Sequence, residues 1–156
     1  MEYFEAPAPS VTNLPSVFLA GGITDCLDWQ AEARELFAED NVAVINPRRK
    51  VFPSASSVAY TSASEQQITW EFNALAGADV VMFWFPAGTS LQPIALYELG
   101  RHGGITDNLV VGRDPGYLRA QNVDVQMRLA RPAVPLHDSL NATVCRVRRM
   151  LSGMPA

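Results

Sequence analysis

The sequence is poor in cysteine and in basic residues, and it has no long apolar run. Its 2 cysteines, Cys26 and Cys145, lie far apart and outside any Cys-x-x-Cys pair, so we expect neither a structural disulfide nor a zinc site. The 12 Lys and Arg residues are outnumbered by 16 Asp and Glu residues, which argues against a protein that binds the nucleic-acid backbone. No apolar run reaches the roughly 18 residues of a membrane helix, and we expect no membrane partner.

Several sequence signals are also missing. Residues 1–15 lack the basic start and apolar middle of a signal peptide, so we expect a cytoplasmic protein. The sequence contains no P-loop, GxGxxG or GxSxG motif, and its His, Cys, Asp and Glu residues show no metal-ligand spacing. We therefore expect no cofactor and no metal.

The residues that are present predict one folded domain. Apolar residues make up 48% of the chain and charged residues 18%, which excludes disorder throughout. A length of 156 residues suits one domain with one core. Pro7, Pro9 and Pro15 predict an irregular N-terminal segment over residues 1–15, followed by a single domain over residues 16–156.

Short apolar runs alternate with longer amphipathic stretches along the chain. The apolar runs are typical of strands covered on both faces; they are residues 17–20, 42–45, 80–85, 109–111 and 133–136. The stretches between them predict helices over residues 28–39, 62–76, 91–102, 121–130 and 139–151. This alternation predicts a flavodoxin-like, doubly wound α/β fold: a parallel five-stranded sheet of order 2-1-3-4-5 with helices on both faces. Ligands of such sheets bind beyond the carboxyl ends of the strands, near the first and third.

Two glutamates fall on helix faces that the apolar pattern turns inward. Glu71 shares the stripe of the helix before the third predicted strand, and Glu98 shares that of the helix after it. The stripes are Ile68, Phe72, Leu75 and Ala76, and Leu91, Ile94, Ala95 and Leu99. A buried carboxylate is costly without a partner, so such positions are candidates for function. The alternative is an exposed Glu98 paired with a basic residue three or four positions later.

Five sequence motifs occur in a characteristic order, the strongest being an alanine-aspartate pair before an apolar strand and then a glutamate-leucine-glycine turn of helix. The motifs are residues 17–23 (VFLAGGI), 46–49 (NPRR), 68–75 (ITWEFNAL), 78–86 (ADVVMFWFP) and 96–100 (LYELG). This set resembles the nucleoside 2-deoxyribosyltransferase family, and more narrowly its nucleoside 2-deoxyribosyltransferase-like branch. The resemblance covers most of residues 17–104, and the chain length also fits.

The resemblance implies roles for individual residues. Glu98 corresponds to the nucleophilic glutamate of the family, and Glu71 to an acidic residue that contacts the base. Gly21 and Gly22 correspond to residues that line the sugar or its 5′ end. In the family, the region after the fourth strand of one subunit closes the active site of a neighbour. The resemblance therefore implies a homo-oligomer, with Asn122 as the contributing residue.

Further candidate substrate contacts follow from their places near predicted strand ends. Asn46 and Arg48 follow the second strand; Arg48 belongs to a basic run that binds a 5′-phosphate or is a solvated cluster. Phe85 ends the third strand, where it stacks on a base or belongs to the core. Ser90 is a candidate partner for the charge of Glu98. Asp25 contacts a ligand or caps the first helix.

Two departures from the family pattern leave three functions open. Gln92 replaces an aspartate six residues before the nucleophile, and Phe18 replaces a tyrosine that hydrogen-bonds it. Gln92 can form paired hydrogen bonds with a base. We expect cleavage or exchange at the N-glycosidic bond of a nucleoside or nucleotide, a small-molecule substrate, through a covalent glycosyl-glutamate. The alternatives are a hydrolase of nucleoside 5′-monophosphates and a catalytically silent nucleotide-binding module of the same fold.

Overall fold

The computed structural model describes residues 1–53 and 59–153, which form an α/β fold around a parallel sheet. Its strands are β1 (Glu2–Glu5), β2 (Ser16–Gly21), β3 (Ala43–Asn46), β4 (Val80–Phe85), β5 (Leu109–Arg113) and β6 (Leu136–His137). Its helices are α1 (Trp29–Leu36), α2 (Ala59–Gly77), α3 (Pro93–Gly103), α4 (Ala120–Ala130) and α5 (Leu140–Leu151). The strands lie in the order β1-β3-β2-β4-β5-β6, and every neighbouring pair is parallel.

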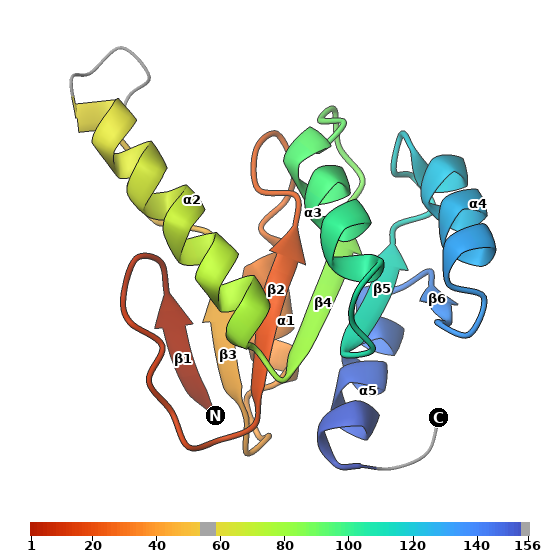
Figure 1. Cartoon of the computed structure of the whole chain (residues 1–156), viewed down its shortest axis with the longest axis horizontal. Coiled ribbons are helices and arrows are strands. Elements are labelled where there is room, and N and C mark those ends of the chain that lie inside the picture. Colours follow the sequence, from red (N-terminus) through yellow and green to blue (C-terminus); the bar gives the residue numbers. More distant parts are fainter. Residues whose placement is uncertain (54–58, 154–156) are drawn as a thin grey trace.

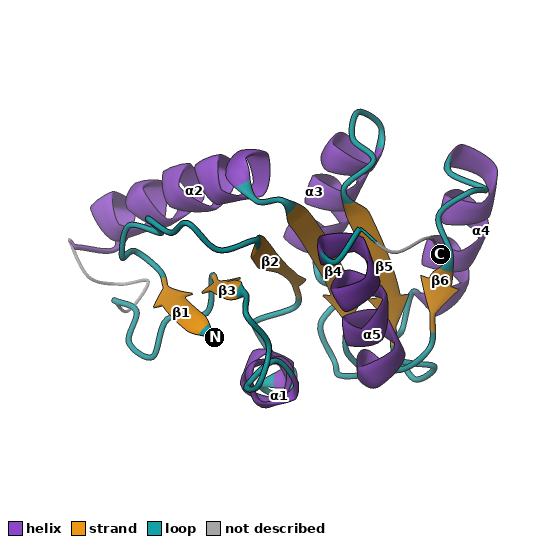
Figure 2. Cartoon of the chain, turned by 90° about the horizontal axis from the view of Figure 1, so that it is seen from below, coloured by secondary structure: helices purple, strands orange, loops and turns teal. Residues whose placement is uncertain are grey.

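Helices cover both faces of the sheet. Figures 1 and 2 show α2, α3 and α4 on one face, and α1 and α5 on the other. All 6 residues of β4 are buried, because alternate side chains enter two separate cores. Phe83 packs into the core under α2, α3 and α4, whereas Met82 and Trp84 pack into the core under α1 and α5. This two-sided burial explains why the strand is apolar at every position.

The predicted α/β class with a parallel sheet is confirmed, but the number of strands and their order are wrong. The sheet has six strands rather than five, because residues 2–5 form β1 at the edge beside β3. The segment over residues 1–15 is therefore not irregular throughout. An edge strand pairs on one side only, so Glu2 and Glu5 can alternate with Tyr3 and Phe4 without forming an apolar run.

The last predicted strand is shorter than expected, and several helix boundaries differ. β6 contains only Leu136 and His137, because Pro135 has no N–H to donate to a neighbouring strand. The helix α3 begins at Pro93 rather than Leu91, because Gln92 has a left-handed backbone. None of the described helices has the length and apolarity needed to span a membrane.

The apolar stripes predicted for α2 and α3 are only partly buried. Ile68 and Phe72 of α2 are 63% and 54% exposed, and Ile94 of α3 is 65% exposed. Leu75 and Leu99 are buried as expected. Both helices carry apolar residues on several sides, so the sequence periodicity did not identify the packed face.

Candidate active site

A cavity of about 760 Å³ lies at the carboxyl end of β2, between α2 and α3. In Figure 1, β2 ends between these two helices. This is the place where a doubly wound sheet of this order binds ligands, since the chain leaves β2 toward β3 on one side and β4 lies on the other. The lining residues come from the first three βα units: Phe18, Ala20, Gly21, Gly22, Ile23, Thr24, Pro47, Arg49, Phe52, Tyr60, Ser64, Gln67, Ile68, Glu71, Ser90, Gln92, Pro93, Ile94, Ala95 and Glu98.

Glu71 and Glu98 lie in this one cavity, on neighbouring helices and 27 positions apart in the sequence. Both carboxyl groups are partly buried. Burial, and then the charge of Glu71, raise the pKa of Glu98 from 4.5 to about 7, against the opposing effect of Arg101. The pair therefore resists double ionisation, and Glu98 keeps its proton to a higher pH than an ordinary glutamate does.

A chain of hydrogen bonds from Arg49 through Gln67 holds the Glu71 carboxyl group. Gln67 Nε2 donates to Glu71 Oε1 and to the carbonyl oxygen of Pro47, each at 2.7 Å. Arg49 Nε donates to Gln67 Oε1. Burial raises the pKa of Glu71, and both the hydrogen bond from Gln67 and the charge of Arg49 oppose that rise. Gln67 was not predicted as a site residue, although a glutamine four residues before an acid is a known helical pair.

Gln92 forms part of the cavity wall and is only 5% exposed. Its backbone has φ 51° and ψ 52°, a left-handed conformation that is uncommon for a residue other than glycine. Its Nε2 donates to the carbonyl oxygen of Pro86 at 3.0 Å, and its backbone N–H donates to Ser90 Oγ at 3.2 Å. Its Oε1 is buried without a hydrogen-bond partner among the described atoms. The amide nitrogen carries a second N–H, and Oε1 has no partner among the described atoms, so the paired hydrogen bonds expected of Gln92 stay a prediction.

Gly22 leaves the space that Gln92 occupies. A Cβ at position 22 would lie 2.5 Å from Gln92 Cδ, closer than two such carbons can approach. Gly22→Ala is expected to lower the free energy of unfolding by about 1–3 kcal/mol, because Gln92 is held by its own hydrogen bonds. Urea unfolding followed by circular dichroism measures this change. Gly77→Ala is the control, since a Cβ there meets nothing within 4 Å; equal stability of the two variants would contradict the prediction.

Gly21 also depends on having no side chain. It has φ 145°, and a Cβ on it would lie 2.0 Å from the carbonyl oxygen of Trp84. The predicted glycine turn at the end of β2 therefore has a steric cause, and both glycines line the cavity. Phe18 lines it too, but its ring is 1% exposed and packs against Trp70 at 6.1 Å between ring centroids.

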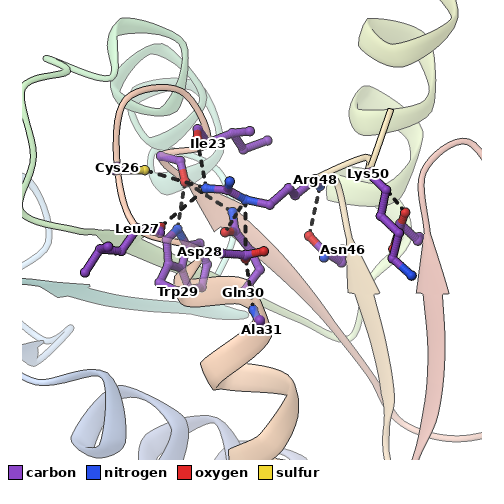
Figure 3. A network of polar contacts seen from close by, with 12 residues as sticks. Ile23, Cys26, Leu27, Asp28, Trp29, Gln30, Ala31, Asn46, Arg48 and Lys50 are labelled. Carbon is purple, nitrogen blue, oxygen red and sulfur yellow. Dashed lines mark hydrogen bonds and ion pairs between the residues drawn. The ribbon is translucent and has the colours of Figure 1, made fainter. Parts of the chain in front are cut away.

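Arg48 holds the loop between β2 and α1 rather than lining the cavity (Figure 3). Its guanidinium donates to Gln30 Oε1 at 3.0 Å and to the carbonyl oxygen of Ile23 at 2.8 Å. It also lies 3.3 Å from Asp28 Oδ1, the residue that caps α1. The next residue, Arg49, is the one that reaches the cavity. The basic run follows β3, as predicted, but Arg48 and Arg49 make different contacts.

Arg48→Ala is expected to lower the free energy of unfolding by about 1–3 kcal/mol, because Gln30 Oε1 and the carbonyl oxygen of Ile23 lose their donor. Gln30 is 0% exposed, so water cannot replace the lost hydrogen bond without local rearrangement. Thermal or urea unfolding measures the loss. Lys50→Ala provides the matched control, because Lys50 is an exposed residue of the same basic run and its change should stay within about 0.5 kcal/mol.

Besides Arg48, four other predicted substrate contacts are not among the residues that line the cavity. Phe85 is 0% exposed and stacks on Tyr117 with 5.3 Å between ring centroids, so the prediction that it stacks on a base is wrong. Asn46 is buried; its Nδ2 donates to the Tyr3 hydroxyl and its Oδ1 accepts from the backbone of Arg48.

The other two are exposed and lie outside the lining. Asp25, with φ 55°, belongs to the turn before α1, and Asn122 lies on α4. Asp28 is the residue that caps α1: its Oδ1 accepts from Ala31 N at 3.1 Å. The role of Asn122 in a neighbouring subunit stays a prediction. Within the described ranges, no group of three or more His, Cys, Asp or Glu residues is placed to hold a metal ion.

Comparison with known protein families agrees with this geometry. A search among curated proteins found no significant match. The family model described as "Nucleoside 2-deoxyribosyltransferase like" matches residues 14–117, which include β2, the cavity and both glutamates. The match covers more than half of the 156 residues. The chain therefore belongs to the nucleoside 2-deoxyribosyltransferase-like family.

Proposed function

We propose that this protein cleaves the N-glycosidic bond of a nucleoside or nucleotide and transfers the sugar to another base or to water, with Glu98 as nucleophile. One observation carries the proposal: Glu98 and Glu71 lie in the same cavity at the ligand edge of the sheet. The family match supports a nucleoside as the small-molecule substrate and glycosyl transfer as the kind of reaction.

In the first step, an ionised carboxylate oxygen of Glu98 attacks C1′ of the sugar. The bond from C1′ to the base nitrogen breaks, its electron pair goes to the base, and a covalent glycosyl-glutamate forms. Glu98 must be ionised to attack. Because its pKa is about 7, the fraction able to react rises as the pH passes through neutrality. Arg101 lies one helical turn further along α3 and favours the ionised form.

Glu71 lies where its carboxyl group can contact the leaving base. A base that has accepted the electron pair needs a proton or hydrogen bonds to leave easily. In the second step, a nitrogen of another base or a water molecule attacks C1′ on the sugar, and the glutamate carboxylate leaves. In either case the attacking nitrogen or water gives up one proton, which goes to the departed nucleobase or to solvent; attack by water is hydrolysis.

A nucleoside 5′-monophosphate hydrolase is the second candidate, and Arg49 favours it. Arg49 lines the cavity, and its guanidinium lies 5.3 Å from the ring centroid of Phe52. A guanidinium group suits phosphate recognition because it donates several hydrogen bonds from one plane. In this proposal Arg49 takes the phosphate-binding role that the sequence suggested for Arg48.

The two functions and the catalytically silent module are separated by one assay. The protein is incubated with deoxynucleosides, ribonucleosides and their monophosphates, with and without an acceptor base, and free base is measured by chromatography. Exchange that requires an acceptor base supports a transferase. Release without an acceptor, restricted to monophosphates, supports the hydrolase. Binding by calorimetry without turnover in any mixture would contradict both and support the module.

A further inference from the structure

The side-chain amide of Gln67 can lie in only one orientation. Its nitrogen faces two acceptors, the carbonyl oxygen of Pro47 and Glu71 Oε1, each at 2.7 Å. Its oxygen faces the Arg49 guanidinium, which only donates. Exchanging the two amide atoms would place an oxygen against two oxygens and an NH2 group against a cation. The chemistry of the three neighbours therefore assigns the N–H to Glu71.

Charged groups reach the two carboxyls from different elements. Arg49 approaches Glu71 from the segment after β3, through Gln67. Arg101 approaches Glu98 on α3, where its guanidinium lies 4.4 Å from the ring centroid of Phe72. The residues that β2 contributes to the lining carry no titratable side chain. Arg49 and the amide donor thus both act on Glu71, whereas Glu98 faces the negative charge of Glu71, whose effect is opposed by the charge of Arg101.

We propose that Gln67, together with Arg49, is a positioning residue that fixes the Glu71 carboxyl in the cavity, keeps it ionised, and thereby leaves the proton shared by the two carboxyls on Glu98. This inference rests on the proposed function for its catalytic consequence, but not for its structural content. Glu71 Oε1 accepts from an N–H, so a proton on that oxygen would face another proton. Glu71 therefore presents a fixed acceptor to an N–H of the base and not a proton donor, so the proton of the leaving base comes from solvent. Glu98 is the group that must lose a proton before it attacks.

The test is a titration of the two carboxyl carbons by NMR, without substrate, in wild type and in Gln67→Leu. Leucine has a similar size but neither donates nor accepts. In the variant, the pKa of Glu71 is expected to rise because its hydrogen-bond donor is lost. The pKa of Glu98 is expected to fall, because its neighbour is then ionised less often. Loss of a residue that merely supports packing would not shift the pKa values of the two carboxyls in opposite directions.

The matched control is Gln66→Leu on the same helix. Gln66 Oε1 accepts from the same Arg49 at 3.3 Å, but Gln66 is exposed and the bond to Glu71 Oε1 comes from Gln67. Its titration curves are expected to match those of wild type. Arg49→Gln tests the charge separately and should raise the pKa of Glu71 in the same direction. If Gln67→Leu fails to fold by circular dichroism, the Arg49→Gln titration tests the inference.

Activity gives a second and separate measurement. In Gln67→Leu, kcat should fall by roughly tenfold to a hundredfold because Glu71 is misplaced. The acid limb of its kcat/KM profile should move to lower pH, so the variant loses less activity at pH 6 than at pH 8. If wild type releases no base, the proposed function fails while the titration still stands. Superimposable titration curves of Glu71 in wild type, Gln67→Leu and Arg49→Gln would overturn the inference.

Discussion

Replacing Glu98 with glutamine is expected to lower the rate of base release by about 10³-fold or more, because an amide cannot attack C1′ and form the covalent intermediate. The substitution keeps the size and shape of the side chain, so the cavity should remain intact. Release of free base by chromatography at about pH 8 measures the effect, since wild-type Glu98, with a pKa of about 7, is mostly ionised there.

The matched control for this loss is Glu65→Gln. Glu65 is an exposed glutamate of α2 outside the residues that line the cavity. The control should retain wild-type activity, and far-UV circular dichroism should show the same fold for both variants. Activity within a few-fold of wild type in a correctly folded Glu98→Gln protein would remove Glu98 as nucleophile. The cavity would then be a binding site whose chemistry lies elsewhere.

The stability of wild type is expected to fall by up to about 3 kcal/mol, relative to Glu98→Gln, as the pH rises from about 4.5 to about 8. The sign follows from the proton on Glu98. The pKa of this group is about 7 in the folded chain and 4.5 as a free side chain, so between these values the folded state binds the extra proton. Stability must then decrease with rising pH in that window and level off above it.

Urea unfolding of both proteins across this pH range measures the difference. Glutamine does not titrate, so the two stability curves should converge at low pH, separate between about pH 4.5 and pH 7 and stay apart above that, with Glu98→Gln the more stable. Glu71→Gln should reduce the separation, because the charge of Glu71 contributes to the raised pKa of Glu98. Curves that stay parallel across the whole range would show that Glu98 is not held in a raised-pKa environment.

Much of the fold could be predicted because the pattern of apolar and polar residues in a segment reflects how that segment is buried. Residues 80–85 are apolar at each position because β4 is covered on both faces, and that pattern located the strand. The same rule failed for β1, where pairing on one side only leaves Glu2 and Glu5 in the strand. It also overextended β6, where Pro135 interrupts the apolar run.

The candidate site was predictable in its location and in its two carboxylates. Glu71 and Glu98 were identified as acids on otherwise apolar helix faces, and they line one cavity. Among the neighbours that tune them, the spacing indicated Arg101 but not Gln67, because Gln67 is an ordinary polar residue on a helix unless its contacts with Arg49 and Pro47 are known. Phe85 was misjudged, since a strand end near a ligand edge can still lie entirely beneath a loop and a helix.

Local patterning was enough to predict the α/β class, the parallel sheet and the edge of the sheet at which the cavity lies, because each depends on short periodic signals. Packing between distant segments settled which side chains enter the cavity. Arg48 and Arg49 show the difference: one secures the loop before α1, and the other reaches Gln67 on α2. Adjacent residues of an extended segment point to opposite sides, and only the path of the folded chain determines which side holds the cavity.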